Sequence, residues 1–142
     1  MIYEMDRDDE KAVREIYALC HPDRPERESG WYWAFPTLVS ENAQRKIVGF
    51  TSFSLTPGPT GILLYGNDLC VAPMYQRQGF GWALAEERRL VGRRLGAKGF
   101  VGVTTADNAP MQRIFERQGF HACQRLPGYF GAEDGWVWVG SL

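Results

Sequence analysis

One stretch of this chain, residues 67–82, constrains the fold more than any other. An extended run ends at Val71, Pro73 stops it, a polar loop follows, and Gly79 and Gly81 lead into a helix. Proline lacks the N–H that a strand ladder needs, and glycine is typical of a tight turn. The stretch therefore predicts a strand, a loop and a helix N-terminus in direct succession.

The main chain of this loop is suited to binding an anion. The first N–H groups of a helix have no partner within the helix and lie at the positive end of its dipole. Gly79 and Gly81 can take positive φ angles and carry no Cβ, so the backbone can curl around a phosphate. Gln76, Arg77 and Gln78 add side-chain donors. The simpler alternative is a tight turn before a helix, which a lone Gly-x-Gly would favour.

Two familiar phosphate-binding loops do not fit this stretch. The P-loop pattern Gly-x-x-x-x-Gly-Lys-Ser/Thr occurs nowhere in the sequence. The dinucleotide pattern Gly-x-Gly-x-x-Gly needs a third glycine where Leu84 stands, directly after the strand. No acidic residue marks the end of the next predicted strand, residues 100–103. We therefore set the dinucleotide fold aside.

Two segments carry a recognisable pair of motifs. Gln76, Gly79 and Gly81 fill the pattern Gln/Arg-x-x-Gly-x-Gly/Ala, after a strand that ends in valine and a loop that contains proline. A second motif occupies residues 108–120. In this order and at this separation, the two resemble motifs A and B of the GNAT superfamily, the acyl-CoA-dependent N-acetyltransferases.

Composition excludes several classes of function. The 142 residues suffice for one domain with a real core, and we expect residues 1–142 to form a single domain. Sixteen Lys+Arg against seventeen Asp+Glu give a net charge of −1, which does not favour nucleic-acid binding. Three scattered cysteines predict neither a disulfide framework nor a metal site. No apolar run reaches a membrane span, so we expect a cytoplasmic protein with no membrane partner.

Hydrophobic periodicity predicts alternating strands and helices. The predicted strands are residues 1–5, 37–41, 46–55, 62–71, 100–103, 120–125 and 135–139; the predicted helices end near Cys20, span residues 80–95, and run from the cap Asn108 to Gly119. This order indicates an α/β fold with a mixed central sheet of about seven strands flanked by helices. The GNAT resemblance covers nearly the whole chain and implies that the fourth and fifth strands splay apart.

Two apolar features are open to more than one interpretation. Residues 31–35 hold four aromatic side chains, either a packed cluster or, as the resemblance suggests, the border of an acceptor pocket. They form either a short helix or a lid. In the last strand, Trp136 and Trp138 alternate with valines, so we expect a helix, a ligand or a partner to cover it. A homodimer is one such partner.

The resemblance assigns the binding of acetyl-CoA to residues that match the family's motifs. The main chain of the motif A strand would pair with the pantetheine arm, the loop and helix start would cradle the pyrophosphate, and an asparagine in motif B would hydrogen-bond the pantetheine. The residues at these positions are Leu69, Cys70, Val71, Gln76, Arg77, Gln78, Gly79, Phe80, Gly81, Trp82 and Asn108. The Val71 N–H would stabilise the oxyanion of the reacting thioester.

The proton transfers are less clearly assigned. An alkylamine is almost wholly protonated at neutral pH, so a base must take its proton. Asp68 is the candidate base, directly or through water, and the alternative is that Asp68 accepts a hydrogen bond from the backbone at a bulge of its strand. Many GNAT members carry a tyrosine that protonates the leaving thiolate where this chain has Phe115. Tyr129 or Tyr65 would then serve, and Tyr129 is our candidate acid.

Other nucleophiles fit less well. No histidine and acid lie in an evident relation to Cys70 in the sequence, so an acyl-cysteine is not expected, and His21 and His121 are taken as ordinary polar residues. The sequence predicts an acetyl-CoA-dependent N-acetyltransferase that acts on a small-molecule or peptide amine without a metal. The alternative, motivated by Phe115 and Asn67, is a CoA-binding sensor or scaffold that does not turn over.

Overall fold

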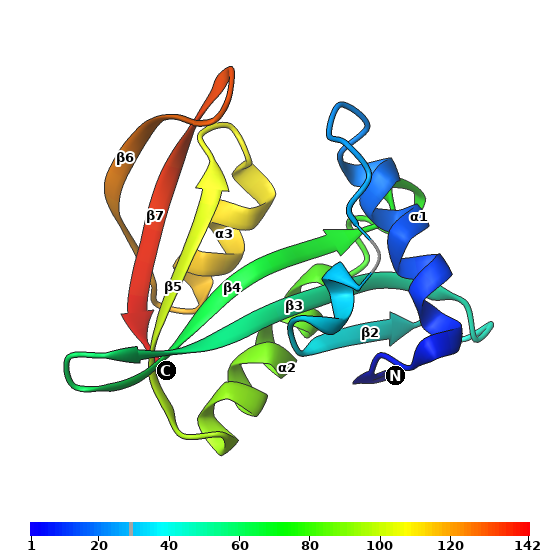
Figure 1. The fold of residues 1–142 in the computed structure, drawn as a ribbon, viewed down its shortest axis with the longest axis horizontal. Coiled ribbons are helices and arrows are strands. Elements are labelled where there is room, and N and C mark those ends of the chain that lie inside the picture. Colours follow the sequence, from blue (N-terminus) through cyan, green and yellow to red (C-terminus); the bar gives the residue numbers. More distant parts are fainter. Residues whose placement is uncertain (29) are drawn as a thin grey trace. The chain divides into compact units, whose positions relative to one another are not determined.

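The computed structural model describes residues 1–28 and 30–142 and contains seven strands and three α-helices within them (Figure 1). The elements are β1 (Ile2–Glu4), α1 (Glu10–Cys20), β2 (Thr37–Glu41), β3 (Ile47–Gly58), β4 (Gly61–Val71), α2 (Phe80–Arg94), β5 (Ala97–Thr105), α3 (Ala109–Arg117), β6 (His121–Phe130) and β7 (Glu133–Ser141). Short 3-10 turns occupy Arg7–Asp9, Trp31–Trp33 and Pro73–Tyr75.

The strands form one mixed sheet in the order β1-β2-β3-β4-β5-β7-β6. β4 and β5 are parallel, whereas β5 pairs with β7, and β7 with β6, in antiparallel fashion. The predicted α/β class and order of elements are therefore confirmed. The chain divides into two compact units, Met1–Ser54 with Asn67–Leu90 and Leu55–Gly66 with Val91–Leu142.

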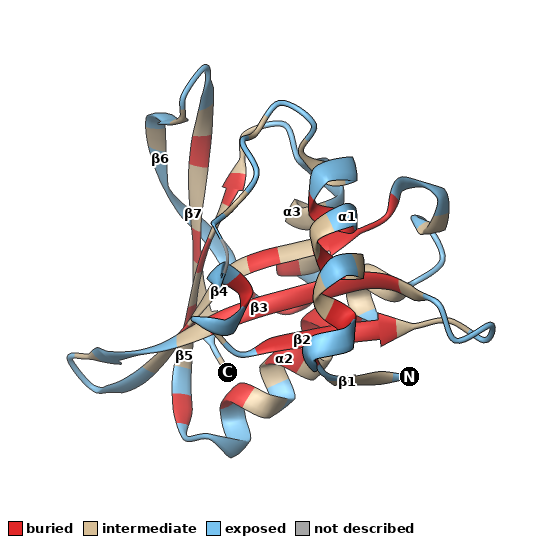
Figure 2. Cartoon of the chain, turned by 45° about the vertical axis from the view of Figure 1, so that its right-hand side comes forward, coloured by how far each residue is buried: buried red, intermediate tan, exposed pale blue. Residues whose placement is uncertain are grey.

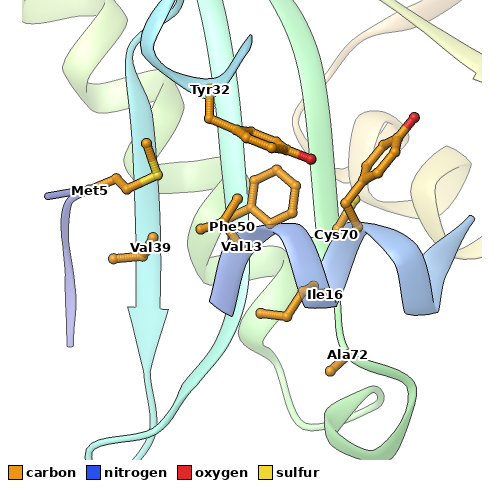
Figure 3. Packing of buried hydrophobic residues seen from close by; sticks show 9 residues of the cluster. Met5, Val13, Ile16, Tyr32, Val39, Phe50, Cys70 and Ala72 are labelled. Carbon is orange, nitrogen blue, oxygen red and sulfur yellow. The ribbon is translucent and has the colours of Figure 1, made fainter. Parts of the chain in front are cut away.

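The first unit is built around α1 and strands β2 and β3. Asp6 and Asp9 form a capping box before α1, with hydrogen bonds from Asp8 N and Asp6 N. Buried residues run along β2 and β3 (Figure 2). Val13 and Ile16 of α1 pack with core residues of these strands (Figure 3). Burying each such side chain contributes about 1.5–3 kcal/mol.

The second unit is held by an aromatic cluster on β5, β7 and α3. Phe115 of α3 lies with its ring centroid 5.2 Å from that of Phe100, and Phe100 stacks on Phe120 at 4.4 Å. Trp138 of β7 packs on Phe115 at 5.6 Å and donates its indole N–H to Thr104 Oγ1. The expectation that a helix covers the last strand is thus confirmed on the face of Trp138.

Two element predictions need correction. The segment 56–61 was expected to break the strands, but β3 continues to Gly58 and β4 starts at Gly61, which leaves a two-residue turn at Pro59 and Thr60. The helix predicted over residues 80–95 ends at Arg94, and the apolar residues Leu90 and Leu95 at its end are exposed. The buried residues of α2 instead include Arg88, because its guanidinium has polar partners inside the unit.

The aromatic segment forms a helical turn rather than an extended lid. Tyr32 is buried, whereas Trp31 and Trp33 are exposed and Phe35 is half-buried. Among the described residues, no helix is both long and apolar enough to cross a lipid bilayer.

Candidate active site

The ladder between β4 and β5 stops halfway along β4. The paired residues run from Ile62 opposite Ala97 to Gly66 opposite Gly102. Beyond this last pair, β4 continues through Leu69, Cys70 and Val71, which belong to the first unit. These are the residues whose backbone groups were predicted to pair with a pantetheine arm.

Several hydrogen bonds fix the end of β4. The Val71 carbonyl accepts from Gln76 Nε2 at 2.9 Å and from Cys20 Sγ at 3.3 Å. The next amide, Ala72 N, donates to Val48 O at 2.9 Å. Gln76 was predicted as a phosphate donor, and the structure shows its amide nitrogen closing the loop onto the strand end. This contact sets the path of the loop that follows.

The loop between β4 and α2 contains two residues in the left-handed region. Arg77 has φ 64° and Gly79 has φ 90°. Gly81, which as glycine can take positive φ, lies inside α2, and Arg77 is the second residue of the loop with positive φ. Gln78 is exposed, as are Arg77 and Gly79. The loop therefore presents its main chain to solvent.

The start of α2 presents main-chain amides at the end of this loop. The first intrahelical bond runs from Ala83 N to Gly79 O at 3.0 Å. The N–H groups of Phe80 and Gly81 precede it and fall in the first turn, where a helix has no internal acceptors for them. A Cβ built on Gly79 would meet no atom within 4 Å, so the space over this turn is open. The turn thus combines main-chain donors with open space above them.

Asp68 is the centre of a buried polar network on β4. Its carboxylate accepts from Arg27 at two points, Nη1 to Oδ2 at 2.7 Å and Nη2 to Oδ1 at 2.9 Å. Ser52 Oγ donates to Oδ2 at 3.0 Å. The Asp68 carbonyl accepts from Thr51 Oγ1 at 2.6 Å and from Arg88 Nη1 at 3.4 Å. The side chain of the candidate base is therefore held by an ion pair and a hydroxyl, not by backbone donors.

Arg27 is enclosed by aromatic rings as well as by Asp68. Its guanidinium carbon lies 3.9 Å from the ring centroid of Tyr17, 4.6 Å from that of Trp31 and 5.5 Å from that of Tyr32. The faces of such rings attract a cation. The hydrogen bond to Asp68 and the charge of Asp68 raise the pKa of Arg27 against the effect of burial, which is the largest cause and lowers it.

A cavity of about 350 Å³ lies beside this arginine in the first unit. Helix α1 contributes Tyr17, the segment that follows it contributes His21, Arg24 and Arg27, and Tyr32 completes the aromatic wall. Of the aromatic segment, Tyr32 lines this cavity and is also part of the hydrophobic core. Volumes of this order accommodate small ligands.

The sequence analysis missed both arginines of this network. Arg27 lies in a segment with no periodicity, and Asp68 is 41 residues away in sequence. Arg88 is a charged residue on a helix, for which a solvated face is the ordinary place, but it is buried, and burial lowers its pKa to about 10. Its position one turn after the buried Leu84 was the only available signal.

The relation of Cys70 to a histidine also needs correction. His21 Nε2 lies 3.8 Å from Cys70 Sγ, although the sequence indicated no such neighbour. The contact arises because His21 directly follows the C-terminus of α1. Burial and the nearby Arg24 lower the pKa of His21, while Asp68 acts in the opposite direction.

The remaining predicted site residues lie in the second unit. Asn108 is the N-cap of α3, as predicted, and its Oδ1 accepts from Met111 N at 3.2 Å. The hydroxyls of Tyr129 and Tyr65 are 3.5 Å apart. Burial, followed by the contact with Tyr129, raises the pKa of Tyr65 to about 12.

Among the described side chains, no group of three or more His, Cys, Asp or Glu could hold a metal ion. The site consists instead of a strand end, a loop with two left-handed residues, a helix N-terminus and a buried carboxylate, all in the first unit.

Comparison with solved structures identifies proteins of the same fold. The chain is 25% identical to yncA from Salmonella typhimurium, determined with its cofactor acetyl-CoA, with coverage of 100% and 93% of the two chains and a TM-score of 0.83. It is 21% identical to the ribosomal-protein-alanine N-acetyltransferase of Brucella melitensis, covering 100% and 99%, at a TM-score of 0.82. It is 18% identical to Arabidopsis thaliana NAA60 in complex with acetyl-CoA, covering 100% and 98%, at a TM-score of 0.85.

Comparison with curated proteins gave no match. The family model described as the acetyltransferase (GNAT) family matches residues 3–120, which span β1 to the end of motif B. This match confirms the resemblance drawn from the two motifs. The chain is a member of the GNAT family of acetyltransferases.

Proposed function

We propose that this protein transfers an acetyl group from acetyl-CoA to a primary amine of a small molecule or a larger acceptor, by direct attack in a ternary complex. The observation that carries the proposal is the loop that joins β4 to α2. Arg77 and Gly79 both adopt left-handed φ angles directly before the helix, and the space over Gly79 is open. Family membership supports the same donor.

The residues assigned to the donor are those of the motif A segment and the α3 cap. Leu69, Cys70 and Val71 would bind the pantetheine arm through main-chain groups, and the loop and first turn of α2 would bind the diphosphate. Asn108 would donate to the pantetheine, since its Oδ1 already caps α3. When bound, acetyl-CoA supplies the activated acetyl group as a thioester. The Val71 N–H would stabilise the charge that develops on the carbonyl oxygen.

Asp68 is the proposed base for the acceptor amine. Arg27 and Ser52 supply three hydrogen bonds to its carboxylate, which has about four acceptor sites. A water molecule or the amine can therefore still donate to Asp68. Arg27 would act as a positioning residue, because its two-point contact fixes the plane of the carboxylate.

The acceptor is proposed to enter the cavity that Tyr17, His21 and Tyr32 line with Arg27. This cavity and Asp68 belong to the same unit, and Arg27 contacts both. Its wall combines aromatic faces with charged groups, which suits an amine carried on a polar acceptor.

Tyr129 is the proposed acid for the departing thiolate, with Tyr65 as the neighbour that hydrogen-bonds it. The raised pKa of Tyr65, about 12, keeps that hydroxyl protonated at neutral pH. Positioned acid and base groups each contribute about 10²–10⁴-fold to a rate. Tyr129→Phe should therefore reduce kcat more than KM for acetyl-CoA, and Tyr65→Phe should reduce it less.

The direct test is release of free CoA thiol from acetyl-CoA across a panel of small amines and peptide N-termini. We expect turnover with at least one amine, and a loss of about 10²-fold or more in Asp68→Asn. Asp134→Asn, which alters an exposed ion pair with Arg125, is the matched control and should retain activity. Binding of CoA with no turnover on any amine would contradict the proposal.

A further inference from the structure

Two cysteines from different elements face each other in the first unit. Cys20 ends α1, and Cys70 lies on β4. Cys20 Sγ is 3.3 Å from Val71 O, and His21 Nε2 is 3.8 Å from Cys70 Sγ, so the last residue of α1 and the residue that follows it contact the last two residues of β4. Cys20 also packs against the core cluster that contains Cys70. These contacts place the two cysteine side chains next to each other.

The two thiols differ in accessibility and acidity. Cys70 is buried in the core beside α1, whereas Cys20 is half-buried (Figure 3). The proximity of Cys70 lowers the pKa of Cys20 below its usual value. The same proximity, followed by burial, raises the pKa of Cys70 well above its usual value. A half-buried thiol of lowered pKa next to a buried thiol of raised pKa suits an attacking and a resolving cysteine.

We propose that Cys20 and Cys70 form an oxidative modification site, which a peroxide converts to an intrachain disulfide that weakens the binding of CoA. The Cys20 thiolate attacks one peroxide oxygen, the O–O bond breaks, and the products are a sulfenic acid and hydroxide or an alkoxide. The Cys70 thiol then displaces water from the Cys20 sulfenic acid, forming the S–S bond. The peroxide is reduced by two electrons and the thiol pair is oxidised by two.

The effect on CoA rests on the proposed function. Oxidised Cys20 has no S–H group to donate to the Val71 carbonyl. The hydrogen bond from Gln76 Nε2 to this carbonyl remains. The S–S bond also fixes Cys70, whose backbone neighbours the Val71 N–H, to the C-terminus of α1. Both changes act on the strand segment assigned to the pantetheine arm.

The covalent step is tested on the full chain with hydrogen peroxide as the probe. Intact-mass analysis should show the loss of two hydrogens, and peptide mapping without reduction should join the peptides of Cys20 and Cys70. The variants Cys20→Ser and Cys70→Ser should lack this product. Cys123→Ser is the matched control, because Cys123 is exposed and lies on β6, and this variant should form the link like the wild type. Products confined to Cys123, or a sulfinic acid on Cys20 without the link, would overturn the proposal.

The functional step compares CoA binding by the reduced and oxidised forms in Cys123→Ser, which cannot dimerise through that cysteine. We expect affinity to fall about tenfold on oxidation and to return after treatment with a thiol reductant. Equal affinity of the linked and reduced forms would overturn the proposal. Absence of CoA binding to the reduced protein would instead contradict the proposed function, while the mass analysis would still decide whether the disulfide forms.

Discussion

Arg27 and Asp68 form a two-point ion pair inside the first unit, with contacts of 2.7 Å and 2.9 Å. The side chains are 15% and 5% exposed, so the pair is largely withdrawn from water. It joins a segment without regular structure to the strand that carries motif A. Asp68, the proposed base, therefore also helps to anchor residues 21–28 to the core.

Asp68→Asn should lower the free energy of unfolding by about 3–5 kcal/mol, because it leaves the buried Arg27 cation without its counter-ion. Urea unfolding followed by circular dichroism measures this change. Asp134→Asn removes the partner of Arg125 in an exposed pair and should cost under about 1 kcal/mol. Equal losses of unfolding free energy in the two variants would show that burial does not strengthen the Arg27–Asp68 pair.

His21 should make the protein less stable in acid. Burial and Arg24 hold the native pKa of His21 below its usual 6.5, and Arg27 adds to this, while Asp68 opposes it. As the pH falls below about 6.5, the unfolded chain binds a proton that the native state does not, so stability decreases. His21→Gln should therefore show a smaller drop in urea midpoint between about pH 7.5 and about pH 5.5 than the wild type.

The control for this measurement is His121→Gln, since His121 lies exposed on β6. It should show the same drop in urea midpoint as the wild type. A His21→Gln protein with an unchanged pH dependence would show that His21 does not cause the acid sensitivity.

Phe115→Tyr should destabilise the protein rather than simply restore the tyrosine found in many relatives. Phe115 is buried among aromatic rings, and its Cζ lies 3.3 Å from the point where a Cβ on Gly102 would sit. A hydroxyl on Cζ would therefore meet β5 in a site built for apolar atoms, at a cost of about 1–3 kcal/mol. Thermal unfolding should show this loss, while Phe130→Tyr, at a half-buried position near a turn, should change little. No loss in Phe115→Tyr would mean that a partner for the hydroxyl exists.

The sequence predicts much of this fold because local rules and packing agree over most of it. The helix from Asn108 shows this, since a capping side chain, an early proline and a glycine after the last turn all coincide with the observed α3. Strand β2 likewise matches its predicted bounds, because its residues are bounded by Pro36 and a polar turn.

The features that the sequence did not predict depend on contacts between residues that lie far apart in the sequence. Nothing local to Arg27 indicates that Tyr17 and Asp68 enclose it, and nothing local to Cys20 indicates Cys70. The burial of Arg88 contradicts its polarity and becomes favourable only when Thr51 and the Asp68 carbonyl are near. Positive φ at Arg77 rather than Gly81 follows from the loop closure that Gln76 makes on Val71.

The central claim is that the turn before α2 holds the diphosphate of CoA, and calorimetric titration of CoA into three proteins tests it most directly. Gly79 and Gly119 have φ 90° and 83°, and a Cβ on either would meet no atom within 4 Å, so Gly79→Ala and Gly119→Ala impose the same backbone strain, of about 1–2 kcal/mol, at different places. We predict that the wild type and Gly119→Ala bind CoA equally and that Gly79→Ala binds about tenfold more weakly. No binding by the wild type, or equal affinity in all three proteins, would contradict the account.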